Sequence, residues 1–204
     1  MNTPDSFKEE QIDVLKEIGN IGIGNALSSL SVLINKRVNM EVPQAGFYPI
    51  ERIIQRIGGY EEQVSCIIFR VTGETQCSIL FVFDSKSTFC LLEMIKGEKQ
   101  DLAKEIGDYD ESIIKEVGNI LAGSYITALC SLTGLKQKVS VPMFAFDMLG
   151  AVLSTSLAVS GYVQEKVLSI ETSLFSGQEK IRGNFLVLLE PESLEKLYTA
   201  LGLA

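Results

Sequence analysis

The chain has no histidine and no tryptophan among its 204 residues. The lack of imidazole excludes Ser-His-Asp and Cys-His catalysis, and it excludes zinc sites that use histidine. Four cysteines are present, but none forms a CxxC pair or a metal-ligand spacing, so we interpret Cys66, Cys77, Cys90 and Cys130 as small core residues. If the chain is an enzyme, these absences leave metal-free or carboxylate-based chemistry.

Basic residues are few, since 18 Lys and Arg stand against 26 Asp and Glu, a net charge of −8. No basic run longer than two residues offsets this charge, so we expect no nucleic-acid partner. The segment Met1–Gln11 does not resemble a signal peptide, and no apolar run approaches the ~20 residues of a membrane helix. We therefore expect a cytoplasmic protein with no membrane partner. A hydrophobic fraction of 46% is enough to bury a core.

The hydrophobic pattern predicts alternating helices and strands. Apolar residues recur every three or four positions in Glu9–Lys36 and from Tyr109 to about Leu135, which predicts two long helices. Shorter helices are predicted over Ser85–Lys96, capped by Asp84, and over Glu192–Leu201. Runs rich in β-branched and aromatic residues predict strands at Arg37–Val42, Val64–Val71, Ser78–Phe83, Gln137–Val141, Ser156–Gln164, Val167–Leu174 and Asn184–Leu189.

The second half of the chain repeats the first. Aligning Asp13–Pro43 with Ser112–Pro142, an offset of 99 residues without a gap, pairs ten identical residues in 31. We interpret the chain as a tandem duplication, with repeat one at about residues 8–107 and repeat two at about 108–204. The predicted fold is α+β: a single pseudo-two-fold domain over residues 1–204, with a largely antiparallel shared sheet and two long helices that carry the sites.

The repeat retains polar residues that core packing does not need. Each copy has Glu-x-x-Asn on its long helix, with a polar residue four before the Glu and a proline 23 after the Asn. A carboxylate and a carboxamide one turn apart can pair with a cation and hold a water in a fixed orientation, which suits hydrolysis by positioning. The alternative is an ordinary solvated helix face. The helix glycines likewise indicate either tight packing or access for a ligand.

The doubled motif resembles the signature of the CheC-type phosphatases of bacterial and archaeal chemotaxis. The strings KEIGNIGIGNA and KEVGNILAGSYITAL around it are also similar to that family, and the resemblance covers essentially the whole chain. Because one-site CheX relatives dimerise and FliY relatives add a flagellar-switch domain, two sites and an end at Ala204 favour the two-site CheC type, expected to be a monomer. The two copies are Asp13, Glu17, Asn20 and Pro43, and Ser112, Glu116, Asn119 and Pro142.

The resemblance implies hydrolysis of the phospho-aspartate on the response regulator CheY. In that family the Asn orients the attacking water and the Glu pairs with the regulator's lysine, which assigns these roles to Asn20 and Asn119 and to Glu17 and Glu116. No cofactor is expected on this chain, because Mg²⁺ belongs to the CheY partner. Two supporting roles are also implied: Asp13 and Ser112 tune the first turn of the site or touch the partner, and Pro43 and Pro142 fix the chain after a strand.

The resemblance also implies a second partner, the receptor deamidase CheD. The family binds CheD through a helix with an exposed Asp, which here corresponds to Phe144–Leu153 with Asp147. An ordinary amphipathic surface helix is the alternative. Two other functions stay open for the whole chain: a non-catalytic adaptor that binds phosphorylated CheY or CheD, and a structural part of the flagellar switch.

Overall fold

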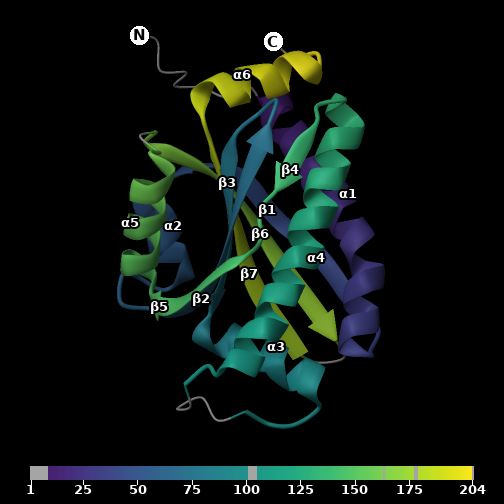
Figure 1. Ribbon diagram of the computed structural model, residues 1–204, viewed down its shortest axis with the longest axis vertical. Helices are drawn as coiled ribbons and strands as arrows, with labels where there is room; N and C mark the ends of the chain where they lie inside the picture. The colour runs from purple at the N-terminus through teal and green to yellow at the C-terminus, as the bar shows by residue number, and fades with distance from the viewer. Residues whose placement is uncertain (1–8, 101–104, 163, 177–178, 204) are drawn as a thin grey trace.

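A seven-stranded antiparallel sheet forms the centre of the protein (Figure 1). The computed structural model describes residues 9–100, 105–162, 164–176 and 179–203. The strand order is β1-β6-β7-β3-β2-β4, and β5 also pairs with β2. The predicted α+β fold with a largely antiparallel sheet is confirmed. The strands are β1 (Asn39–Pro49), β2 (Gln63–Gly73), β3 (Cys77–Asp84), β4 (Gln137–Val139), β5 (Met143–Met148), β6 (Lys166–Ser176) and β7 (Glu179–Leu189).

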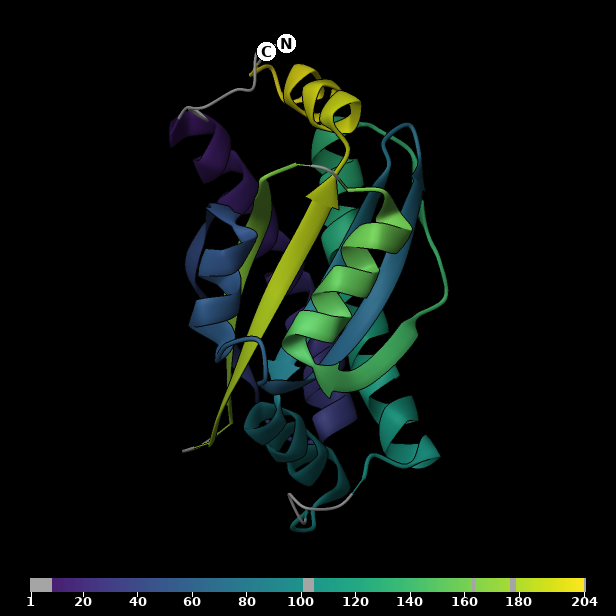
Figure 2. The ribbon, with the colours of Figure 1, turned by 90° about the vertical axis from the view of Figure 1, so that its left-hand side faces the viewer.

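Helices cover both faces of the sheet (Figures 1 and 2). Two 26-residue helices, α1 (Glu9–Ile34) and α4 (Asp108–Thr133), lie on one face, with α3 (Ser85–Lys96) and α6 (Pro191–Ala200) towards its ends. The short helices α2 (Ile50–Ile57) and α5 (Leu149–Ser160) lie on the other face. Because alternate strand residues point to opposite faces, the sheet separates two apolar clusters.

The order of elements is the same in the two halves, since each half runs α-β-α-β-β-α when β4 and β5 are taken together. Each half also places its first strand beside a strand of the other half: β1 pairs with β6, and β4 and β5 pair with β2. At the centre, Leu80 of β3 pairs with Leu186 of β7. The duplication itself stays an inference from the sequence.

The helix α3 has the predicted boundaries and cap. The Asp84 carboxylate accepts a hydrogen bond from the Ser87 amide at 2.6 Å, and Gly97 ends the helix in a left-handed conformation. Lys96 in its last turn donates to Asp110 at 2.9 Å, and this hydrogen bond raises the pKa of Lys96. The buried Asp110 thereby ties the first turn of α4 to the end of α3.

Three expectations about local structure are wrong. The described residues of Ser156–Gln164 form no strand, because residues up to Ser160 complete α5, whose inner side packs on the sheet. The segment Phe144–Leu153 is no continuous helix, because Phe144–Met148 belong to β5, which pairs with β2. The strand predicted at Arg37–Val42 continues to Pro49, and α2 follows it without having been predicted.

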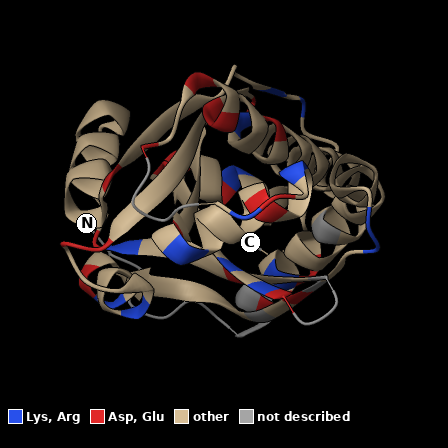
Figure 3. Ribbon diagram, turned by 90° about the horizontal axis from the view of Figure 1, so that it is seen from below, with Lys and Arg blue, Asp and Glu red and all other residues tan. Residues whose placement is uncertain are grey.

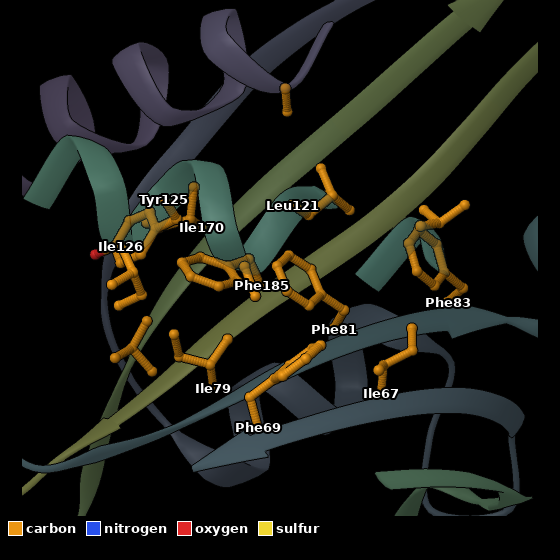
Figure 4. Packing of buried hydrophobic residues seen from close by; sticks show 14 of the residues in the cluster. Ile67, Phe69, Ile79, Phe81, Phe83, Leu121, Tyr125, Ile126, Ile170 and Phe185 are labelled. Atoms are coloured by element: carbon orange, nitrogen blue, oxygen red, sulfur yellow. The ribbon is translucent and has the colours of Figure 1, made fainter. Parts of the chain in front are cut away.

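The two long helices lie side by side and run in opposite directions (Figure 1). They meet at a glycine. A Cβ added to Gly22 would lie 2.8 Å from the Cα of Tyr125. Beneath this contact the Tyr125 ring meets Phe185 at 4.5 Å between centroids, and Phe185 meets Phe81 at 4.8 Å (Figure 4). The helices therefore rest on an aromatic cluster at the middle of the sheet.

We expect Gly22→Ala to destabilise the fold by about 1–3 kcal/mol, because the methyl group would overlap the α4 backbone. Urea unfolding followed by far-UV circular dichroism measures this change, since the chain has no tryptophan to report it. The matched control is Gly24→Ala in the same helix, which faces open space and should gain up to about 1 kcal/mol. Equal stability of the two variants would contradict the close helix contact.

Candidate functional site

The first motif copy forms an exposed line along α1, and we call Asp13, Glu17, Asn20 and Gly24 stripe one. All four residues are exposed, whereas Ile18 between them is fully buried. Spacings of four, three and four residues put the stripe on one side of the helix. Glu17 and Asn20 therefore stand one turn apart and present a carboxylate and an amide to solvent together.

The second copy forms the same line on α4, and we call Ser112, Glu116, Asn119 and Gly123 stripe two. These residues are also exposed. The Asn119 amide donates to the Glu116 carboxylate over 3.5 Å, a long contact that leaves both groups able to turn to a partner. The Ser112 hydroxyl donates to the Asp108 carbonyl at 2.8 Å, so it is held on its own helix.

The helix glycines divide into two groups: some allow tight packing, and others leave open space where a ligand could approach. Gly19 and Gly118 face the sheet, where an added Cβ would lie 3.5 Å from Ile170 and 2.7 Å from Ile67, respectively. Gly24 and Gly123 are different, because in the described part of the chain an added Cβ there would meet no atom within 4 Å. Packing does not require these two glycines, and they leave the surface beside each Asn low.

The two motif prolines lie at irregular positions near the sheet edges. Val42 and Pro43 of β1 together face only Thr172 of β6, which is a β-bulge. Residues 140–142, ending in Pro142, bridge β4 and β5 opposite residues 69–70 of β2, again one residue more than the partner strand. A residue without an N–H fits such edge positions. Pro142 follows β4, as expected, but the expectation that Pro43 follows a strand is wrong, because β1 continues through the bulge to Pro49. Of Pro43 the structure describes only the backbone.

The structure does not bring the two motif copies into one site. Glu17 and Asn20 stay on α1, and Glu116 and Asn119 stay on α4. α1 packs over β1, at one edge of the sheet, while α4 packs over β2, β4 and β5 towards the other edge. The chain thus carries two separate candidate sites of the same chemistry.

Sequence reasoning missed Tyr109, which lies on the same side of α4 as stripe two. Its side chain is 70% exposed, an unusual state for a large aromatic residue. It precedes Glu116 by seven residues, two turns of helix, and this spacing could have identified it. The corresponding position in the first half is Glu10. Tyr109 gives stripe two an aromatic neighbour of the type common at protein interfaces.

Asp147 is exposed and is the second-last residue of β5, two residues before α5 begins. Its carboxylate accepts a hydrogen bond from the Met148 amide at 2.7 Å. This places Asp147 at a strand-to-helix junction rather than on the helix that we expected. It belongs to neither stripe and lies on the second half's edge of the sheet.

The buried cysteines Cys66 and Cys77 are unsuited to nucleophilic catalysis. Burial raises the pKa of the Cys66 thiol, and burial with the nearby Glu190 raises that of Cys77 to about 12. In the part of the chain that the structure covers, no three His, Cys, Asp or Glu side chains gather as a metal site would need. Within the same residues, no helix has the length and apolar character to cross a membrane.

Comparison with known proteins agrees with the doubled motif. Residues 10–46 and 110–144 both match the model of the CheC-like family, and each segment contains one motif copy. The whole chain is similar to the CheY-P phosphatase CheC of Bacillus subtilis (strain 168), with 35% identity over 206 residues that cover 99% of each chain. The chain belongs to the CheC-like family. The resemblance that the motif indicated is confirmed.

Solved structures share the fold of this CheC-like chain. FliY from Thermotoga maritima superposes with a TM-score of 0.78 at 19% identity, over 96% of this chain and 98% of that one. CheX in a CheX-CheY-BeF3-Mg²⁺ complex from Borrelia burgdorferi superposes with a TM-score of 0.54 at 16% identity, over 84% and 96% of the two chains. At these identities the likeness concerns the fold alone.

Alanine at the four candidate positions Glu17, Asn20, Glu116 and Asn119 should leave the free energy of unfolding within about 0.5 kcal/mol of the wild type, because exposed helix positions tolerate alanine. Urea unfolding of the quadruple variant measures this. The contrasting variant is Ile114→Ala on the buried side of α4, which should lose about 2–5 kcal/mol. A quadruple variant as unstable as Ile114→Ala would assign the motif to folding rather than function.

Proposed function

We propose that this chain is a phosphatase that hydrolyses the phospho-aspartate of the response regulator CheY. The observation that carries the proposal is the exposed Glu-x-x-Asn pair on each long helix, beside a glycine that packing does not require. The relative from Bacillus subtilis is named a CheY-P phosphatase, and the CheX relative is seen in complex with CheY. Both relatives support CheY as the partner of this chain.

In the proposed reaction Asn20 or Asn119 enters the phosphorylation site of the regulator. An amide has one acceptor and two donor positions, so it can hold a water in line with the bond between phosphorus and the aspartyl oxygen. The water oxygen bonds to phosphorus as that bond breaks, which yields inorganic phosphate and a free aspartate carboxylate. The contribution of this chain is the position of the water.

The carboxylates have a different role in the same complex. Glu17 or Glu116 pairs with the lysine of the regulator and sets the depth and direction in which the neighbouring Asn enters. The regulator supplies Mg²⁺, which neutralises charge on the phosphoryl oxygens, so this chain needs no cofactor of its own. Gly24 and Gly123 let the regulator surface approach the helix backbone beside the Asn.

Turnover distinguishes this proposal from an adaptor that only binds phosphorylated CheY. An adaptor would form a saturable complex and leave the regulator's own rate of phosphate loss unchanged. The paired amide and carboxylate favour the enzyme, because binding a surface lysine needs the Glu but not the Asn. Replacement of the Asn residues therefore distinguishes the enzyme from the adaptor.

We expect the double variant Asn20→Ala, Asn119→Ala to lose all acceleration of phosphate release from phosphorylated CheY with Mg²⁺, because the amides that hold the water are gone. Phosphate release under single-turnover conditions measures it. Asn25→Ala is the matched control, an exposed Asn of α1 on another side of the helix, and it should keep wild-type activity. Wild-type activity in the double variant would overturn the proposed mechanism.

A second candidate function, binding of CheD, concerns the opposite face of the sheet. The helix α5 contains no charged residue in its twelve positions and appears uncharged throughout on the left of Figure 3. Val159 in its last turn is 67% exposed, and Met148 and Tyr60 at its start are 54% and 58% exposed. An apolar surface of this kind beside the exposed Asp147 is typical of a protein interface. We propose it as the surface for CheD.

Val159→Lys should lower the affinity for CheD at least tenfold, because it places an unpaired charge on the exposed apolar surface of α5. Isothermal titration calorimetry with CheD measures the affinity. The matched control is Gln55→Lys on α2, the other helix of the same face, which should bind CheD normally. Equal affinities for both variants would place the CheD surface elsewhere.

A further inference from the structure

The directions of the two stripes follow from the glycine contacts of each helix. In α1, Gly19 points to the sheet and Gly22 points to α4. Successive helix residues are rotated by about 100°, so Asn20 and Glu17 lie about 100° and 160° from the Gly19 direction, while Gly22 lies about 60° to the other side. Stripe one therefore points away from the sheet and away from α4.

The same geometry holds for α4. Gly118 points to Ile67 of the sheet, and Leu121 and Tyr125 line the small apolar cavity that Gly19 and Gly22 share with them. Asn119 follows Gly118 as Asn20 follows Gly19, so stripe two points away from α1. Since α1 and α4 cover opposite sides of one face of the sheet, the two stripes point away from the sheet and diverge from each other.

The two sites are close compared with the size of a regulator domain. The Gly22 contact with Tyr125, with a rise of about 1.5 Å per helix residue, puts the α-carbons of Asn20 and Asn119 within about 20 Å of each other. A globular domain of about 100 residues has a radius of gyration of about 13 Å, and hence a diameter above 30 Å. Two such domains would collide if both stripes faced the same way.

We infer that one chain binds two phosphorylated regulator domains at once, one on each stripe, and that the sites turn over independently. The inference rests on the proposed function and extends it. The divergence of the stripes moves the centres of the bound domains apart by more than the spacing of the two Asn residues. The close contact between α1 and α4 at Gly22 fixes this divergence independently of which site is occupied.

Titration of the full chain with Mg²⁺- and BeF3-activated CheY tests the inference. Native mass spectrometry and calorimetry should show two regulators per wild-type chain. The single variants Glu17→Arg and Glu116→Arg should each bind one regulator, because each places a cation against the regulator's lysine at one site. Asn25→Ala should still bind two regulators. At saturating phosphorylated CheY, the turnover rate of the wild type should equal the sum of the rates of the two single-site variants.

Two results would overturn independent occupancy. One is a single regulator bound to the wild type while each Arg variant also binds one. The other is a wild-type turnover rate that lies between those of the single-site variants instead of at their sum. Both results leave acceleration by the wild type intact, so they differ from failure of the proposed function, in which wild-type chain gives no acceleration at all.

Discussion

The contact between Gly22 and Tyr125 is the constraint on which the rest of the structure depends. No side chain larger than hydrogen fits at Gly22 without moving the α4 backbone. The glycine therefore allows the two 26-residue helices to approach each other closely over the Phe81 and Phe185 rings. With both helices held on the sheet by buried residues at three- and four-residue spacing, their rotation about their own axes is fixed. Every exposed residue of the motif then has a defined direction.

The parts of the fold that the sequence could predict are those whose signal is local or repeated. The two long helices, the Asp84 cap and the strands of the central hairpins follow from periodicity and capping chemistry. The errors concern β1, α2, β5 and α5. At the start of the segment predicted as a strand, Leu157 and Val159 alternate with the small residues Ser156, Ala158 and Ser160, which resembles a strand pattern. Burial of one side of α5 against the sheet, a tertiary effect, makes these residues part of a helix. The bulge at Pro43 let β1 continue past a residue that normally ends a strand.

The candidate site was predictable in its residues but not in its arrangement. The doubled spacing identified Glu17, Asn20, Glu116 and Asn119, and the structure exposes all four. Which glycines pack and which leave open space depends on contacts between segments far apart in sequence, such as Gly118 with Ile67. Tyr109 was missed for a related reason, since one aromatic residue near a helix start is equally compatible with the core, and its exposure decides otherwise.

The two halves of the chain are alike on one face of the sheet and different on the other. On the face of α1 and α4 the polar motif is kept in both halves, and two copies of one surface suit two copies of one partner. On the other face the halves differ: α2 carries Glu51, Arg52 and Arg56, while α5 carries no charge. A charged and an uncharged surface cannot both fit the same partner well, because a buried unpaired charge weakens binding. The symmetric face therefore suits repeated use of one regulator, and the asymmetric face suits one different protein at a single place.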